Sequence, residues 1–162
     1  MTTPGIDRIR VAANAVVIRA DEVLLIEFDD ASGVHYNFPG GGVEIGETLE
    51  QAVRREVMEE ANLEIAVNRL LLVVESVGAR NTNIIRGERV PWNEVRFFFL
   101  GTPAENSDAR LPNTPDANQV NVRWVRISDL ESIRLLPQIS HELITVLNMP
   151  SAPTPIVANP HP

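Results

Sequence analysis

GGVEIGETLEQAVRREVMEEANL, residues Gly41 to Leu63, predicts a glycine-rich turn followed by one helix. Glycines at the start of this stretch permit backbone angles that other residues avoid, and they let a ligand approach the main chain. Thr48 suits the N-cap position, and Gln51 three residues later completes a capping box. Neither Pro nor Gly occurs from Leu49 to Ala61, so we expect the helix to cover that range.

Three glutamates of this predicted helix stand in or beside its apolar sector. On a helical wheel of about 100° per residue, Glu56 and Glu60 fall inside the sector and Glu59 lies at its edge. Their mutual repulsion costs roughly 0.2–0.5 kcal/mol per exposed pair, and negative charge is unfavourable near the C-terminal end of a helix. A hard divalent cation such as Mg²⁺ or Mn²⁺ would offset this repulsion. From these residues alone, a solvated charged helix face remains the alternative.

The stretch resembles the Nudix box, whose pattern is G-x5-E-x7-R-E-U-x-E-E-x-G-U, with U a bulky aliphatic residue. The slots filled in register are Gly41, Glu47, Arg55, Glu56, Val57, Glu59, Glu60 and Leu63. Asn62 stands where the family prefers Gly. We expect this position just past the helix end, in the left-handed conformation that Asn tolerates best after Gly. Weaker similarity, including Phe38–Gly41 and Trp124-Val125, extends from Arg8 to Asn148.

The resemblance implies the Nudix fold, an α/β fold of the α+β type with a mixed β-sheet sandwiched between helices. It also implies a pyrophosphohydrolase that cleaves a nucleoside diphosphate linked to a further group X with metal-activated water. Glu56, Glu60 and Glu59, with the backbone of Gly40, would hold Mg²⁺ or Mn²⁺.

Arg55 and Glu47 complete the set of catalytic residues that the resemblance implies. Arg55 would hold a box glutamate by an ion pair and so orient it for the metal. Glu47 would contact the residues that bind the metal without binding the metal itself.

The general base is left open by the sequence. Many relatives carry a glutamate just before the late Trp strand, where this chain has the neutral pair Asn118-Gln119. Glu59, Asp116 and Glu94 are the acids that could take this role.

Two regions outside the box are candidates for substrate contacts. Residues 78–93 are predicted as a loop that carries Arg80, Arg86, Arg89 and Trp92. Arginine forks bind phosphate and Trp can stack on a base, so this loop could clamp the substrate. A solvated mobile loop is the alternative. Tyr36 could stack on a base or pack in the core.

Apolar runs predict the remaining elements. Strands are expected at residues 9–18, 23–28, 36–39, 64–77, 95–100 and 120–127. Val120, Val122 and Trp124 are expected on the buried face of the last strand. A long loop should span residues 103–118, a short helix should start at Ser128 or Asp129, and a last helix should cover residues 137–147.

The composition fits one domain over residues 1–149 and a proline-rich flexible tail over residues 150–162. A net charge of −8 argues against a general nucleic-acid partner, so we expect a small-molecule nucleotide substrate. The chain has neither Cys nor Lys, which excludes thiolate and lysine Schiff-base chemistry. No apolar run could span a membrane and no signal-peptide pattern is present, so a cytoplasmic location is expected. We expect a monomer or homodimer.

Two other functions compete with the hydrolase. A Nudix-fold ligand sensor would not need three clustered glutamates. A Nudix-fold prenyl-diphosphate isomerase would need a cysteine, which this chain lacks.

Overall fold

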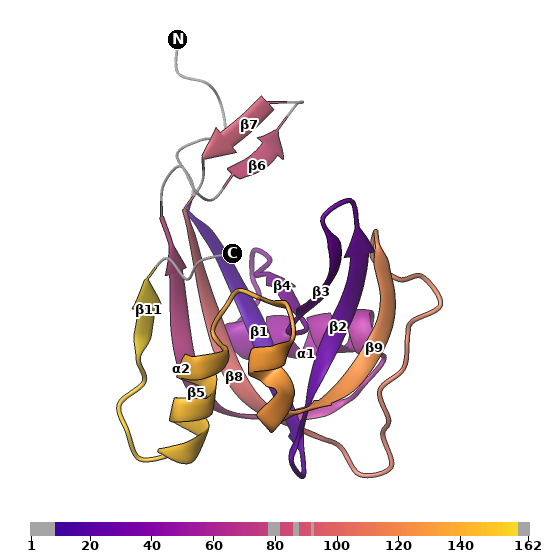
Figure 1. Cartoon of the computed structure of the whole chain (residues 1–162), viewed down its shortest axis with the longest axis vertical. Coiled ribbons are helices and arrows are strands. Elements are labelled where there is room, and N and C mark those ends of the chain that lie inside the picture. Colours follow the sequence, from indigo (N-terminus) through magenta and orange to yellow (C-terminus); the bar gives the residue numbers. More distant parts are fainter. Residues whose placement is uncertain (1–8, 78–81, 86–87, 92, 159–162) are drawn as a thin grey trace.

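A curled mixed β-sheet with helices on both faces forms the body of the chain (Figure 1). The computed structural model describes residues 9–77, 82–85, 88–91 and 93–158. The strands are β1 (Arg10–Arg19), β2 (Glu22–Asp30), β3 (Gly33–Asn37), β4 (Gly40–Gly42), β5 (Ile65–Ser76), β6 (Thr82–Ile85), β7 (Glu88–Pro91), β8 (Glu94–Pro103), β9 (Gln119–Arg126), β10 (Leu135–Leu136) and β11 (Ile156–Ala158). The helices are α1 (Leu49–Ala61), the 3-10 helix η1 (Ile127–Ser132) and α2 (Ser140–Asn148).

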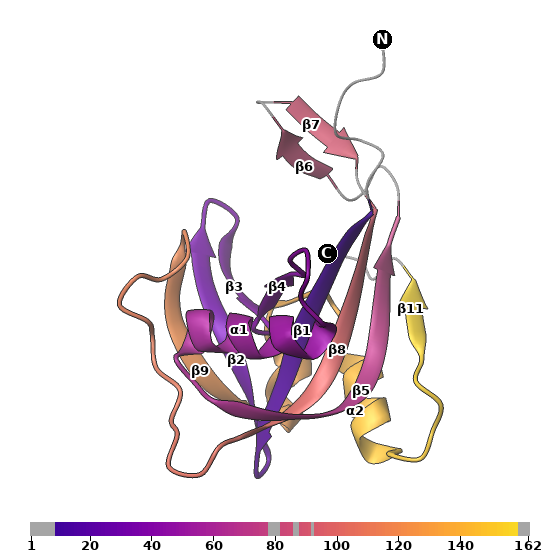
Figure 2. The same cartoon turned by 180° about the vertical axis from the view of Figure 1, so that it is seen from behind.

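The main sheet divides along β1 into two halves. Its order is β10-β3-β2-β1-β8-β5-β11, with β9 paired to β2 and β4 paired to β1. β1 pairs with β8 in parallel from Arg10 to Val17, but it pairs with β2 only at Ile18 and Arg19. The first part of β1 therefore has β4, and not β2, along its other edge. This division separates β2, β3 and β9 from β8 and β5, as both views show (Figures 1 and 2).

Alternation along β1 gives each face of the sheet its own core. Ala13, Ala15 and Val17 pack in the cluster that includes Val53 and Val57 of α1. Val16 belongs to the opposite cluster, which holds residues of η1 and α2. Successive side chains of a strand point to opposite faces, so one strand serves both layers. The predicted sandwich of a mixed sheet between helices is confirmed.

Three segments differ from the sequence-based expectation. Within the predicted loop 78–93, residues of β6 and β7 form an antiparallel hairpin. In the predicted flexible tail, β11 pairs in parallel with β5, with Ile156 beside Val73, because β5 offers an open edge to a strand-forming segment. The last helix begins at Ser140 and not at Pro137, because Leu135 and Leu136 pair with β3 as β10.

A register shift at Glu27 and Phe28 changes the expected face of β9. Gln119 pairs with Phe28 and Asn121 with Glu27, so Val120 has no partner of its own on β2. Val120 is consequently 47% exposed, whereas Gln119 is buried. Neither α1 nor α2, nor any other helix in the described ranges, has the length and apolar character of a membrane span.

Candidate active site

Both ends of α1 are fixed by the residues that the sequence indicated. Thr48 and Gln51 form a reciprocal capping box, in which each side chain accepts a hydrogen bond from the backbone amide of the other. Asn62 adopts the left-handed conformation with φ 47° and ψ 43°, and its amide donates to the carbonyl of Met58 at 3.0 Å. These two predictions are confirmed. The helix therefore begins and ends at defined residues, which fixes the positions of its glutamates.

Two of these glutamates lie against the glycine strand β4. The amide of Gly40 donates to Oε2 of Glu60 at 2.8 Å, and Glu60 is only 8% exposed. A Cβ atom on Gly41 would collide with the carboxylate of Glu56. Glycine is thus required at position 41 because it lets the helix bring a carboxylate onto the main chain.

Arg55 connects the carboxylates of the site. Its Nε and Nη2 atoms donate to the two carboxylate oxygens of Glu47, at 2.9 and 3.0 Å. Its Nη1 donates to Glu56 at 2.8 Å and to Glu59 at 3.2 Å, and Nη2 also reaches the carbonyl of Gly42 at 3.0 Å. A planar guanidinium held by two oxygens of one partner has little freedom, so it fixes the direction of the Glu56 carboxylate.

Burial and mutual repulsion disturb the ionisation of these acids. Burial raises the pKa of Glu60 to about 8, with further increases from Glu56, Asp116 and Glu59, while the Gly40 amide opposes the change. Burial also raises the pKa of Glu56, against the effect of the Arg55 hydrogen bond. In contrast, hydrogen bonds from Arg55 lower the pKa of Glu47. The charged forms of Glu56 and Glu60 are therefore disfavoured in the folded chain, in spite of their contacts with Arg55 and Gly40.

A cleft of about 230 Å³ opens beside Glu60. Residues from five strands and two loops complete its lining. They are Gly40 and Gly41 of β4, Arg10, Ala12 and Asn14 of β1, Phe28 of β2, Asn37 of β3, Arg96 of β8, and Phe38 and Asp116, which lie outside the strands. The Oδ1 atoms of Asn14 and Asn37 are buried and have no hydrogen-bond partner. Buried acceptors without a partner are rare in folded chains, and here they lie in a cleft open to a ligand.

The donor chemistry of the site fits a hard divalent cation. Glu60 lines the cleft, Glu56 lies against Gly41 of its lining, and Glu59 shares the Nη1 atom of Arg55 with Glu56. Carboxylate oxygens of this kind are the ligands that Mg²⁺ and Mn²⁺ prefer. Within the described ranges, no three acidic or histidine side chains already converge as a complete ligand set. Metal binding would therefore draw these carboxylates together from their places beside Arg55 and Gly40.

The candidate bases occupy very different environments. Asp116 lies on the cleft, next to Glu60 in its lining. Glu94 is 1% exposed and forms ion pairs with Arg10 and Arg96, so it is not available to a water molecule. The side chain of Glu59 is 58% exposed and touches Arg55.

The predicted substrate contacts are only partly placed by the structure. Tyr36 is half-buried and packs against the core cluster that contains Phe38 and Leu135, and it does not line the cleft. Arg80, Arg86 and Trp92 lie outside the described residues, and so does the side chain of Arg89.

Sequence reasoning missed Arg10, Asn14, Arg96 and Gln119. The side chain of Gln119 donates to the backbone carbonyl of Glu60 at 2.7 Å and thereby ties β9 to the end of α1. The polar residues Arg10 and Asn14 in an otherwise apolar strand were the available signal, because neither suits a buried β-strand.

Comparisons with known proteins agree with this geometry. The NUDIX domain family model matches residues 8–146. The NAD-capped RNA hydrolase NudC of Photorhabdus laumondii is 51% identical over 126 residues, which cover 78% of this chain and 42% of that protein. The NudC protein of Yersinia enterocolitica is 31% identical over 112 residues, or 69% of this chain and 36% of that one. The chain thus spans less than half the length of these curated relatives.

Solved structures share the fold along almost the whole chain. A NUDIX hydrolase from Nitrosomonas europaea superposes with a TM-score of 0.70 at 22% identity, covering 88% of this chain and 90% of that one. A MutT NUDIX hydrolase from Burkholderia pseudomallei gives a TM-score of 0.56 at 29% identity and covers 88% and 98% of the two chains. The match of the NUDIX domain family model to residues 8–146, with the box glutamates placed on α1 beside β4, shows that the chain belongs to the Nudix hydrolase family.

Proposed function

We propose that this chain hydrolyses the pyrophosphate bond of a nucleoside diphosphate linked to a further group, using a divalent cation held by Glu56, Glu60 and Glu59. The observation that carries the proposal is the packing of the Glu56 and Glu60 carboxylates against Gly41 and Gly40 of β4, two glycines that line the polar cleft together with Glu60. A bound Mg²⁺ or Mn²⁺ would neutralise the diphosphate, polarise the phosphoryl oxygen and lower the pKa of a bound water.

Residues of the chain itself supply positioning. Arg55 fixes the Glu56 carboxylate, and the Gly40 amide fixes that of Glu60. Phosphoryl transfer depends mainly on such positioning and on charge stabilisation, so these contacts are where we expect catalysis to be sensitive.

Among the candidate bases, we assign proton removal from the attacking water to Asp116. Its carboxylate lies on the cleft with Glu60, whereas Glu94 is buried between two arginines. A general base must be within reach of the water whose proton it takes, and position in the cleft favours Asp116.

The first substrates to test are NAD-type dinucleotides. NudC proteins, which are named NAD-capped RNA hydrolases, share 51% identity with this chain over 126 residues. The net charge of −8 disfavours long contacts with RNA, so we place the dinucleotide and not the polynucleotide first.

The test is product release from a panel that contains NADH, ADP-ribose, nucleotide sugars, dinucleoside polyphosphates, nucleoside triphosphates and an NAD-capped RNA. Each compound is incubated with Mg²⁺, with Mn²⁺ and with a chelator. We expect metal-dependent cleavage of at least one member by the wild type, and a loss of at least about 100-fold in Glu56→Gln with the fold intact. If the protein binds one compound of the panel tightly but cleaves none of them, the hydrolase proposal is refuted and the ligand sensor takes its place.

A further inference from the structure

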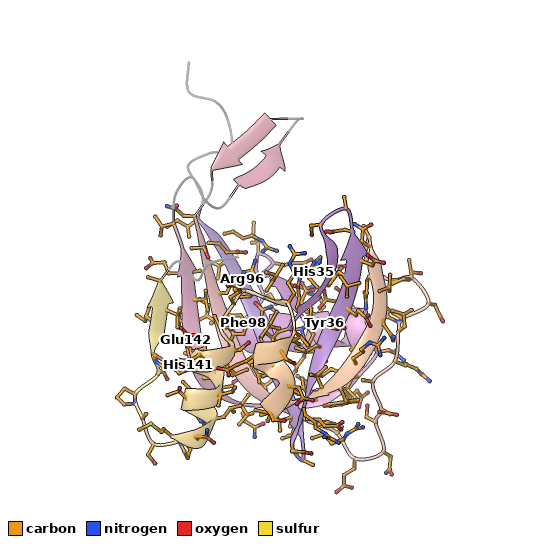
Figure 3. The ribbon with its side chains drawn as sticks, in the orientation of Figure 1. His35, Tyr36, Arg96, Phe98, His141 and Glu142 are labelled. Atoms are coloured by element: carbon orange, nitrogen blue, oxygen red, sulfur yellow. The ribbon has the colours of Figure 1, made fainter. Side chains whose placement is uncertain are left out.

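Two arginines share one buried carboxylate on the wall of the cleft. In the parallel register of β1 and β8, Arg10 lies opposite Glu94 and Ala12 lies opposite Arg96. Residues two apart on a strand share a face, so these side chains stand on the same side of the sheet. Arg10 and Arg96 both line the cleft that also holds Glu60 (Arg96, on β8, is labelled in Figure 3).

Glu94 is positioned to orient both arginines. It is 1% exposed, and its Oε2 accepts from Nε of Arg96 at 2.7 Å while its Oε1 accepts from Nη1 of Arg10. The two arginine side chains remain 34% and 28% exposed. Burying a carboxylate is costly, and such pairs are weak evidence of stabilisation by themselves. Held in this way, however, the two guanidinium groups and Glu94 form a cluster with a net charge of +1, and the other charged residues of the cleft, Glu60 and Asp116, are acidic.

Donors suited to a phosphate are present in this cluster. Among the described residues, Arg96 is bound only through Nε, so its two Nη groups make no hydrogen bond within that part of the chain. A guanidinium that presents two parallel N–H groups matches the oxygens of a phosphate. The cleft thus has an acidic side, where a cation would bind, and a basic side formed by the arginines. An extended anion could bind the cation with one part and the arginines with another.

The same wall also offers an unpartnered acceptor. Asn14, two residues beyond Ala12, is 5% exposed, and its Oδ1 has no partner, while its Nδ2 donates to the carbonyl of Phe38 at 3.3 Å. An occupant with a hydroxyl or amino group would satisfy this oxygen. A nucleotide carries such donors on its ribose and base, next to its phosphates.

We propose that Arg10 and Arg96, held by Glu94, bind a phosphate group of the nucleotide on the β1–β8 wall of the cleft, apart from the cation held by α1. The inference rests on the proposed function for the identity of the nucleotide as substrate. It assigns Glu94 to positioning and not to proton transfer.

The test is the affinity for ADP and for adenosine in metal-free buffer, measured by calorimetry. We expect the wild type to bind ADP more tightly than adenosine, and Arg96→Gln and Arg10→Gln each to weaken ADP binding at least about 10-fold with adenosine unchanged. Arg123→Gln is the matched control, because Arg123 forms the same kind of ion pair with Glu27 on β2 but does not line the cleft. It should leave the affinity for ADP unchanged.

A second variant covers the case in which Arg96→Gln fails to fold. Arg96→Lys keeps a positive charge beside Glu94 but loses the guanidinium fork. We expect it to retain the wild-type melting temperature within a few degrees and to weaken ADP binding several-fold.

The outcomes separate this inference from the proposed function. Equal affinity of wild type and both arginine variants for ADP, or no preference of the wild type for ADP over adenosine, would overturn the phosphate subsite even if metal-dependent hydrolysis is observed. The opposite outcome is also possible to detect. If the protein cleaves no compound of the panel but binds ADP more tightly than adenosine, and Arg96→Gln removes that preference, the phosphate subsite is supported and the proposed hydrolase activity is refuted.

Discussion

Replacing Glu60 by Gln should make the metal-free protein more stable. The carboxyl group of Glu60 has a pKa of about 8 in the folded chain, against an ordinary value of 4.5, mainly because it is buried. The folded state therefore holds this proton more tightly than the unfolded state does. Between pH 4.5 and pH 8 the unfolded chain loses this proton while the folded chain keeps it, so the stability present at low pH is lost across that window.

The size of the effect follows from the pKa change. One pKa unit corresponds to about 1.4 kcal/mol, so at pH 7 the folded chain, which keeps Glu60 protonated, has lost about 3 kcal/mol of unfolding free energy relative to low pH. Glutamine keeps the volume and can still accept from the Gly40 amide, but it carries no charge. For a chain of this length, about 3 kcal/mol corresponds to a rise of about 6–12 °C in melting temperature.

The assay is thermal unfolding in the presence of a chelator, at pH 5 and at pH 8, for the wild type and Glu60→Gln. The gain should be large at pH 8 and small at pH 5. Glu59→Gln is the control, because the Glu59 side chain is 58% exposed, and its effect should stay within about 0.5 kcal/mol. A Glu60→Gln protein that is no more stable than the wild type at pH 8, or equally stabilised at both pH values, would refute the reasoning.

Substitutions at three further positions test other parts of the site. Arg55→Ala should weaken Mg²⁺ binding by about 10–100-fold, as measured by calorimetry, because Glu56 loses the group that orients it; an unchanged titration curve would count against this role. Asp116→Asn should lower kcat by about 100-fold or more with KM nearly unchanged, and full activity would remove Asp116 as the base. Asn62→Ala should cost about 1 kcal/mol in urea unfolding while Asn62→Gly should be close to neutral, since the position has φ 47°; equal costs would contradict the left-handed cap.

Local chemistry explains why the sequence predicted α1 so well. The N-cap Thr48, the capping partner Gln51 and the left-handed Asn62 act within a few residues of one another, so their roles do not depend on the rest of the chain. The same holds for the strong apolar strands β1, β2 and β8. The match of the box pattern then placed Arg55 beside Glu56 and Glu47, and the structure brings these three together.

Contacts between segments that lie far apart along the chain could not be predicted from the sequence. The pairing of β11 with β5 depends on an edge that is defined only once the sheet is assembled. The bulge that buries Gln119 and exposes Val120 comes from the register between β9 and β2. Glu94 could be named as a possible base from its residue type, but only the parallel register with β1 shows that Arg10 lies next to it.

Binding of Mn²⁺ to the isolated protein, followed by electron paramagnetic resonance, tests most directly whether Glu56 and Glu60 hold the cation. The free Mn²⁺ signal is titrated against wild type, Glu56→Gln, Glu60→Gln and Glu50→Gln, the last an exposed glutamate in the first turn of the same helix. The account predicts saturable binding by the wild type and by Glu50→Gln, and a loss of at least about 10-fold in affinity for each of the other two. Equal affinity in all four proteins would contradict it.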